Sequence, residues 1–138
     1  MSVEIYLVLN GNCREAVEFY SKVFNTEAEQ LTTFGESPQH PDYQLPEDTK
    51  DLIMHARLTI SGSTIMFSDT FPGEPYIAGN NVTLALISNN MDDLKSWYEQ
   101  LKDGGTVDME LQETFWSKLY GQVTDKFGIH WQINYDAK

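Results

Sequence analysis

The sequence predicts an α+β fold built from two copies of one βαβββ unit. The two halves of the 138-residue chain repeat one order of elements: a strand, an amphipathic helix and three further strands. The aromatic pair Phe19-Tyr20 on the first helix is matched by Trp97-Tyr98 on the second, at an offset of 78 residues (97 − 19). Gly62 and Gly128, which precede the last strand of each half, are 66 residues apart (128 − 62). One insertion in the first half accounts for the difference of 12 residues (78 − 66) between the offsets.

The first half, residues 1–70, begins with an apolar strand that ends in turn residues, Val3–Leu9. The next segment has apolar residues at the spacing of one helical face. It predicts an amphipathic helix with Asn12 as its N-cap and Glu15 closing a capping box. Three strands are predicted after this helix, the last two joined as a tight hairpin: Glu27–Phe34, Ile53–Ser61 and Ser63–Asp69.

Two segments without a helical or strand pattern interrupt this order. Residues 35–51 contain Pro38, Pro41 and Pro46 among polar residues and predict an inserted loop. This loop is longer than most connections in compact domains, and a lid and an interface arm both stay open as its role. Residues 71–81, with two prolines and two glycines, predict a linker between the halves.

The second half, residues 82–138, repeats the order of the first. Val82–Ser88 alternates like a half-buried strand, and Asn90 is the expected N-cap of a second amphipathic helix that ends at Gly104-Gly105. Three more strands are predicted: Thr106–Glu113, Leu119–Thr124 and Ile129–Tyr135. We therefore expect a single domain, residues 1–138, made of two halves and one linker.

Composition and charge exclude several classes of function. The chain has 9 Lys+Arg against 21 Asp+Glu, a net charge of −12, which argues against binding to nucleic acid or to an anionic membrane surface. Hydrophobic residues make up 41% of the chain, enough for a folded core. The lone Cys13 excludes an internal disulfide, and no segment resembles a signal peptide or membrane span. We expect a cytoplasmic protein.

Seven segments carry a resemblance to a known family: Asn10-Gly11-Asn12-Cys13, residues 16–20, His55-Ala56, residues 65–69, residues 113–116, residues 121–128 and Trp131. With the duplicated βαβββ layout, they resemble the PhnB-like branch of the vicinal oxygen chelate (glyoxalase/bleomycin resistance/dioxygenase) superfamily. The resemblance covers essentially the whole chain. It implies that each half curls a four-stranded sheet into a half-barrel around a cavity, and that the protein is a homodimer. It does not fix the reaction, because function depends on the site.

The resemblance also implies where a metal would bind. Catalytic members of the superfamily chelate a divalent metal with His, Glu or Gln from the first and last strands of each half. Aligned by strand ends, these positions fall near Ile5, Met66, Thr83 and Gln132. Only Gln132 could coordinate, and a shift by one residue would turn Glu4 to the opposite face. We expect no metal at these positions and no other cofactor.

Histidines are the first candidates for a functional site. His55 and Arg57 alternate with Ala56 and Leu58, so we expect both to point into the cavity if the apolar face packs under the helix. There His55 could act as an acid or base, or bind an anion beside Arg57. The alternative is a strand histidine that only holds two strands in register. His130 is a weaker candidate, and His40 falls in the inserted loop.

Aromatic and acidic residues of the second half complete the candidates. Trp116 and Tyr120 could stack on a planar ligand, whereas core or dimer packing is the favoured interpretation for Trp131. Glu113 is a candidate base, with a solvated strand-end charge as the equal alternative. For Cys13, on the apolar helix face, inert burial is favoured over reactivity. The full set of expected ligand-binding residues is His55, Arg57, Ser68, Trp116, Tyr120 and Gln132, with His55 and Glu113 as candidate catalytic residues.

Two functional hypotheses follow. The first is a metal-free homodimer that binds an unidentified small molecule, without nucleic acid or membrane partners. The second is an enzyme of the superfamily, a lyase, isomerase or dioxygenase-like protein, with a displaced metal site or one completed by a partner subunit. A structural dimer with a filled cavity is a third alternative.

Overall fold

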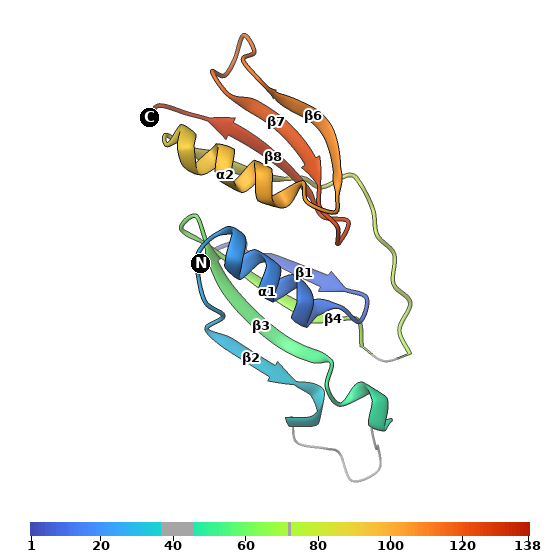
Figure 1. Ribbon diagram of the computed structural model, residues 1–138. Helices are drawn as coiled ribbons and strands as arrows, with labels where there is room; N and C mark the ends of the chain where they lie inside the picture. Colours follow the sequence, from blue (N-terminus) through green and yellow to red (C-terminus); the bar gives the residue numbers. More distant parts are fainter. Residues whose placement is uncertain (37–45, 72) are drawn as a thin grey trace. The chain divides into compact units, whose positions relative to one another are not determined.

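The computed structural model describes residues 1–36, 46–71 and 73–138 and divides the chain into two compact units, Met1–Tyr76 and Ile77–Lys138 (Figure 1). The boundary between the units falls inside the predicted linker, and the described residues of that linker form no helix or strand. Pro38, His40 and Pro41 of the predicted inserted loop lie outside the described residues.

The first unit contains one four-stranded mixed sheet with strand order β1-β4-β3-β2. β1 runs parallel to β4, and the other neighbours are antiparallel. Two short 3₁₀ turns flank the undescribed part of the inserted loop, η1 (Phe34–Glu36) and η2 (Glu47–Thr49). The other elements are β1 (Ile5–Leu9), α1 (Cys13–Val23), β2 (Gln30–Thr33), β3 (Ile53–Ile60) and β4 (Ser63–Asp69).

The second unit repeats this topology with strand order β5-β8-β7-β6. β5 is parallel to β8, as β1 is to β4. The helices have 11 residues each and begin 78 residues apart (91 − 13), the offset that the aromatic pairs predict. The predicted duplicated α+β fold is therefore confirmed. Its elements are β5 (Leu84–Ser88), α2 (Met91–Leu101), β6 (Thr106–Gln112), β7 (Tyr120–Thr124) and β8 (His130–Tyr135).

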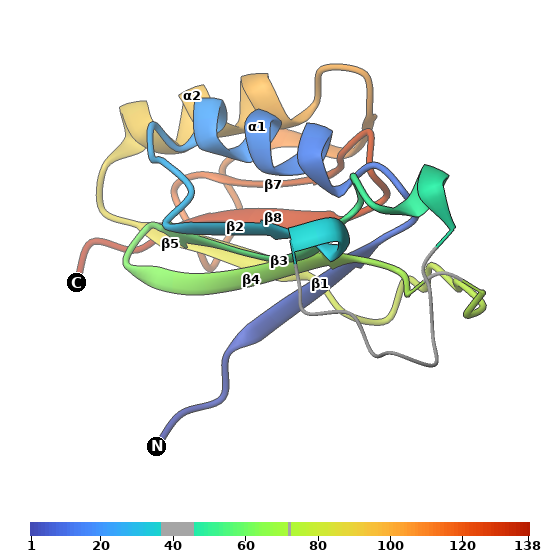
Figure 2. The same ribbon diagram turned by 90° about the horizontal axis from the view of Figure 1, so that it is seen from below.

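In the first unit, α1 covers one face of the sheet (Figure 2). Tyr20 of α1 is fully buried and stacks on Phe67 of β4 with ring centroids 5.8 Å apart. On β3, the buried residues Ala56, Leu58 and Ile60 alternate with partly or fully exposed ones. The prediction that the apolar residues of this strand pack under the helix is confirmed, so His55 and Arg57 lie on the opposite face.

The second unit is built in the same way around α2. Tyr98, the counterpart of Tyr20, is buried on this helix, and Trp131 of β8 is 1% exposed on the helix-covered face of the sheet. The core interpretation of Trp131 is therefore confirmed. Its indole Nε1 donates a 2.8 Å hydrogen bond to the buried carboxylate of Asp125, which also accepts from the backbone N–H groups of Phe127 and Ile129.

The start of α1 differs from the predicted cap. Asn12 makes no side-chain capping bond, whereas Oδ1 of Asp69, at the end of β4, accepts the N–H of Cys13 at 2.9 Å. Oδ2 of the same carboxylate accepts the N–H of Ile53 at 2.8 Å. The predicted cap of α2 is confirmed, because Asn90 Oδ1 accepts the N–H of Asp93.

The two glycines used to align the halves occupy equivalent turns. Gly62 has φ of +86° in the β3–β4 turn, and Gly128 has φ of +84° in the β7–β8 turn. Residues with a Cβ rarely adopt this left-handed conformation, which explains glycine at both places.

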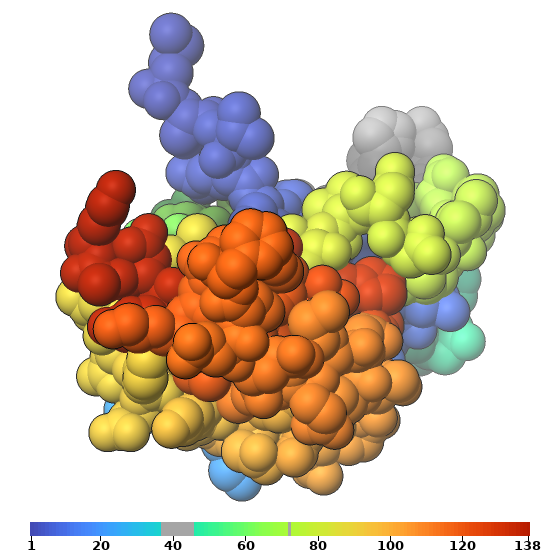
Figure 3. Space-filling model, turned by 90° about the horizontal axis from the view of Figure 1, so that it is seen from above, coloured from blue at the N-terminus to red at the C-terminus, as the bar shows by residue number. Residues whose placement is uncertain are grey.

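Two further features concern the N-terminal residues and the length of the helices. The residues before β1 stand exposed at the surface, where their blue atoms are visible in Figure 3. Among the described residues, no helix has the length and apolar character needed to cross a membrane.

Cys13 is fully buried at the start of α1. Burial, with a smaller contribution from the charge of Asp69, raises the pKa of its thiol from 9.0 to about 12. We expect no alkylation of Cys13 by iodoacetamide in the folded protein at neutral pH and full alkylation in urea, measured by mass spectrometry.

The raised thiol pKa also predicts a pH dependence of stability. Above pH 9.0 the unfolded thiol ionises while the folded thiol stays protonated, so the free energy of unfolding falls as pH rises. Cys13→Ala removes this contribution. The expected result is a stability difference between wild type and Cys13→Ala that changes between pH 8 and pH 10, by up to ~1.4 kcal/mol per pH unit. A constant difference would contradict it.

Candidate functional site

The face of the first sheet away from α1, called here the first open face, carries the candidate residues of the first half. The strand register places Tyr6, Met66, Arg57 and Gln30 in one row across all four strands. Arg57 is the cation of this row and lies between a thioether and an amide side chain. The row therefore presents one positive charge, and the nearby carboxylate of Glu29 accepts a hydrogen bond from Thr59 at 3.0 Å.

The guanidinium of Arg57 is incompletely paired. Its Nε is buried and makes no hydrogen bond to any residue that the structure describes. A buried N–H left without an acceptor costs about 1–3 kcal/mol, and more when it belongs to a charged group. An acceptor from outside the described chain would remove this cost.

His55 and Ser68 lie on the same face as Arg57. His55 pairs with Thr32 of β2, and its ring centroid is 6.1 Å from that of Tyr6. Ser68 of β4 pairs with Val8 of β1, and Ser68 is buried while Val8 is exposed. The structure thus brings together the three candidates of the first half, His55, Arg57 and Ser68, on one polar and aromatic surface.

The face of the second sheet away from α2, the second open face, carries the remaining candidates. Gln132 of β8 pairs with Gln122 of β7, whose Nε2 donates to the hydroxyl of Tyr120 at 3.0 Å. The Trp116 ring meets the Tyr120 ring edge-on at a centroid distance of 5.2 Å. Trp116, Tyr120 and Gln132 thus form a group that joins aromatic surface to amides.

The loop between β6 and β7 holds Trp116 in place. Oγ of the buried Ser117 lies 2.9 Å from the carbonyl oxygen of Leu119 and 3.0 Å from that of Tyr135, which share its one hydroxyl hydrogen, and the Ser117 N–H donates to Oγ1 of Thr114. Phe115 is 98% exposed beside Trp116. Glu113 is exposed directly after β6, in the other unit from His55.

The residues at the predicted metal positions do not fit a divalent metal. Ile5 pairs with the buried Ile65 and lies on the helix side, so the open face of β1 carries the neighbouring Tyr6 at this level. Thr83 precedes β5, and Ala85 is the first residue of β5 on the open face. On the open faces, Tyr6 lies beside Met66, and Ala85 lies beside Gln132. A phenol, a thioether, a methyl group and an amide make a poor donor set. In the described part of the chain, no three His, Cys, Asp or Glu side chains gather to hold a metal.

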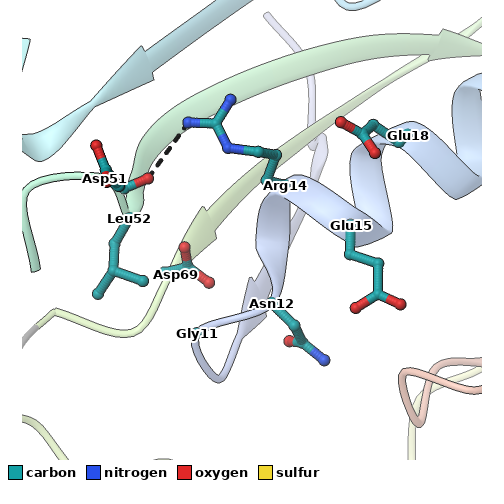
Figure 4. A pocket seen from close by; sticks show the side chains of 8 residues that line it. All are labelled: Gly11, Asn12, Arg14, Glu15, Glu18, Asp51, Leu52 and Asp69. Atoms are coloured by element: carbon teal, nitrogen blue, oxygen red, sulfur yellow. Dashed lines mark hydrogen bonds between the residues drawn. The ribbon is translucent and has the colours of Figure 1, made fainter. Parts of the chain in front are cut away.

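A hollow of about 370 Å³ lies on the other side of the first sheet, at the start of α1 (Figure 4). Arg14 reaches across it to the carbonyl oxygen of Asp51 at 3.3 Å. The hollow contains none of the predicted site residues, and the carboxylate of Asp69 in its wall is already engaged by two backbone N–H groups. Its lining is Gly11, Asn12, Arg14, Glu15, Glu18, Asp51, Leu52 and Asp69.

Several residues of the open faces were missed from the sequence. Gln30 and Tyr6 join the row of Arg57 only through the strand register, which no local pattern reveals. Alternation could have placed Tyr6, had Leu9 been recognised as the residue of β1 that packs under the helix.

Comparison with known proteins relates this chain to a family. Residues 3–133 match the family described as the Glyoxalase/Bleomycin resistance protein/Dioxygenase superfamily. Protein YjdN of Escherichia coli (strain K12) is 36% identical over an alignment of 144 residues that covers 97% of this chain and 95% of YjdN. The crystal structure of protein PA1353 from Pseudomonas aeruginosa is also 36% identical, covers 98% of both chains and has a TM-score of 0.85. The PhnB protein from Bacillus cereus has the same fold, with a TM-score of 0.77 at 20% identity over 99% of this chain and 100% of that chain.

Proposed function

The chain belongs to the Glyoxalase/Bleomycin resistance protein/Dioxygenase superfamily, and we propose that it binds a small organic anion at Arg57. Its shared fold with a PhnB protein agrees with the resemblance to the PhnB-like branch. The proposal is a binding protein that works without a metal. The observation that carries it is the buried Nε of Arg57, which finds no acceptor among the described residues.

The chemistry of a guanidinium selects the ligand class. Its planar N–H groups match the two oxygens of a carboxylate, and such paired hydrogen bonds are among the strongest in proteins. No described carboxylate makes a salt bridge with Arg57. His55 and Ser68 on the same face supply further hydrogen-bonding groups, and the ring of Tyr6 supplies apolar surface.

The second open face supports the same class of function. Trp116 and Tyr120 offer ring surface, and Gln132 offers an amide that donates and accepts. We propose these three residues as a ligand-binding surface of the second unit, taken by itself.

A homodimer is part of this proposal. The edge strands β1 and β5 carry apolar side chains at the surface, with Val8 44% and Ile87 54% exposed. Contact with a second copy would cover these residues. Unpaired sheet edges favour such association because their backbone N–H and C=O groups can pair with another chain. Light scattering after size exclusion tests the assembly, and a monomer at micromolar concentration would remove this part of the proposal.

Benzoate is a suitable probe because it combines a carboxylate with a ring. We expect Arg57→Ala to weaken benzoate binding at least tenfold in isothermal titration, since it removes the paired charged hydrogen bonds. Arg57→Lys keeps the positive charge but lacks the planar guanidinium. Its affinity for benzoate is expected to lie between those of the wild type and Arg57→Ala.

Arg14→Ala is the matched control, because Arg14 is the other arginine of the chain and lies on α1. It should leave benzoate affinity within twofold of wild type. Equal binding by wild type and Arg57→Ala would refute the anion site.

The alternative, an enzyme with a metal completed by a partner, has a separate test. It assigns His55 as a ligand and Glu113 as a carboxylate supplied across a subunit interface. Elemental analysis of protein purified without chelators distinguishes the two accounts. Stoichiometric metal that is lost in His55→Ala would replace the metal-free proposal by the enzyme.

A further inference from the structure

A hydrogen-bonded chain crosses three strands of the second open face. Asp108 Oδ2 accepts the hydroxyl hydrogen of Thr124 at 2.6 Å, and Thr124 Oγ1 lies 2.8 Å from Nδ1 of His130. Thr124 and His130 are register partners on β7 and β8. Asp108 is the extra residue of a bulge in β6, since Val107 pairs with Val123 and Met109 with Gln122. The bulge frees Asp108 from the ladder, an arrangement that commonly redirects a side chain.

Proton counting gives the direction of each bond. An ionised carboxylate only accepts, so the single hydroxyl hydrogen of Thr124 is committed to Asp108. The short distance is typical of a hydroxyl bound to a carboxylate. The remaining bond must then be donated by His130, from Nδ1–H to Thr124 Oγ1. In the neutral imidazole this tautomer leaves the lone pair on Nε2.

The Nε2 atom of His130 is available to a ligand. It makes no hydrogen bond to the residues that the structure describes, and it is not among the buried atoms that lack a partner. His130 is partly exposed and shares the second open face with Gln132, two residues further along β8. The amides of Gln132 and Gln122 lie in the adjacent row.

We propose that Asp108 and Thr124 hold His130 with Nε2 as a proton acceptor for a small molecule that presents a weakly acidic O–H or N–H group. His130 is the residue that contacts the ligand, and Asp108 and Thr124 are positioning residues. This site goes beyond the anion site at Arg57 and does not depend on it, because its three residues belong to the second unit.

The first experiment identifies the tautomer of His130 by long-range ¹H–¹⁵N correlation. It is recorded in mildly alkaline buffer, in which the neutral form of an imidazole predominates. We expect Nδ1–H in the wild type and in Thr124→Ser, which keeps the hydroxyl. Thr124→Val removes the acceptor of Nδ1–H, and Asp108→Ala removes the acceptor of the Thr124 hydroxyl hydrogen, which can then bond to Nδ1. Both should shift His130 toward Nε2–H. Asp103→Asn, at an exposed site after α2, should change nothing.

Phenol and anisole test the ligand class, because they differ in one O–H group. Phenol is expected to move the Nε2 signal of His130 in the wild type and in Thr124→Ser, with at least a tenfold weaker response in Thr124→Val. Anisole is expected to leave it in place. An Nε2–H tautomer in the wild type, or equal responses to phenol and anisole, would overturn the proposal, while an intact benzoate site would leave the function at Arg57 standing.

Discussion

Asp125→Ala is expected to lower the free energy of unfolding by about 4 kcal/mol, the largest effect of any single substitution considered for this chain. Asp125 is 3% exposed, and its carboxylate accepts from the N–H groups of Phe127 and Ile129 and from the indole of Trp131. Alanine leaves these donors in a site with little access to water. The β7–β8 turn and the largest buried side chain of the second unit both lose their anchor.

Urea unfolding followed by circular dichroism measures this loss. Asp125→Asn keeps one acceptor oxygen and is expected to cost less than alanine, about 2 kcal/mol. The exposed Asp103→Ala serves as control, with an expected change within about 0.5 kcal/mol. A loss below about 1 kcal/mol for Asp125→Ala would mean that water replaces the carboxylate, and would contradict this role.

Asp69→Ala is expected to cost about 3 kcal/mol by the same measurement. Its two carboxylate oxygens hold the N–H of Cys13 at the start of α1 and the N–H of Ile53 at the start of β3. The residue therefore joins the helix to the sheet at the end of β4. Loss of the negative charge at the helix N-terminus adds a smaller unfavourable contribution.

Hydrogen exchange gives a local signature of the same substitution. The amides of Cys13 and Ile53 should lose protection more than amides in the middle of β3. Asp51→Ala is the matched control, because Asp51 is exposed and contributes its backbone carbonyl oxygen to the contact with Arg14. Uniform loss of protection across the first unit would contradict a local anchoring role for Asp69.

The elements of the fold could be predicted because periodicity is a local property. The apolar stripes of α1 and α2 and the alternation of β3 are visible in a few turns or residues of sequence. The duplication was visible because each half carries the same helix–strand order. The role of Asp69 as the cap of α1 could not be predicted. Asp69 is 56 residues from Cys13 in the sequence, and the nearer Asn12 is a common capping residue.

The faces of β1 show a second limit of local patterns. Its sequence is apolar at every position, so alternation does not reveal which residues pack under α1, and the side chain on the open face nearest to Ile5 is Tyr6. The sequence places His55 and Arg57 correctly because Ala56 and Leu58 alternate with them. The hydrogen bonds that link Asp108, Thr124 and His130 depend on a bulge in β6 and on the register of β7 and β8. No sequence pattern in this protein reveals either feature.

The binding of an anion at Arg57 is tested most directly by the Nε–H signals of Arg57 and Arg14 in ¹H–¹⁵N spectra recorded during a benzoate titration. The account predicts a saturable shift of the Arg57 signal, absent for benzyl alcohol, which lacks the charge, while the Arg14 signal stays in place. An unchanged Arg57 signal at benzoate concentrations that saturate binding, or an equal shift of both arginines, would contradict it.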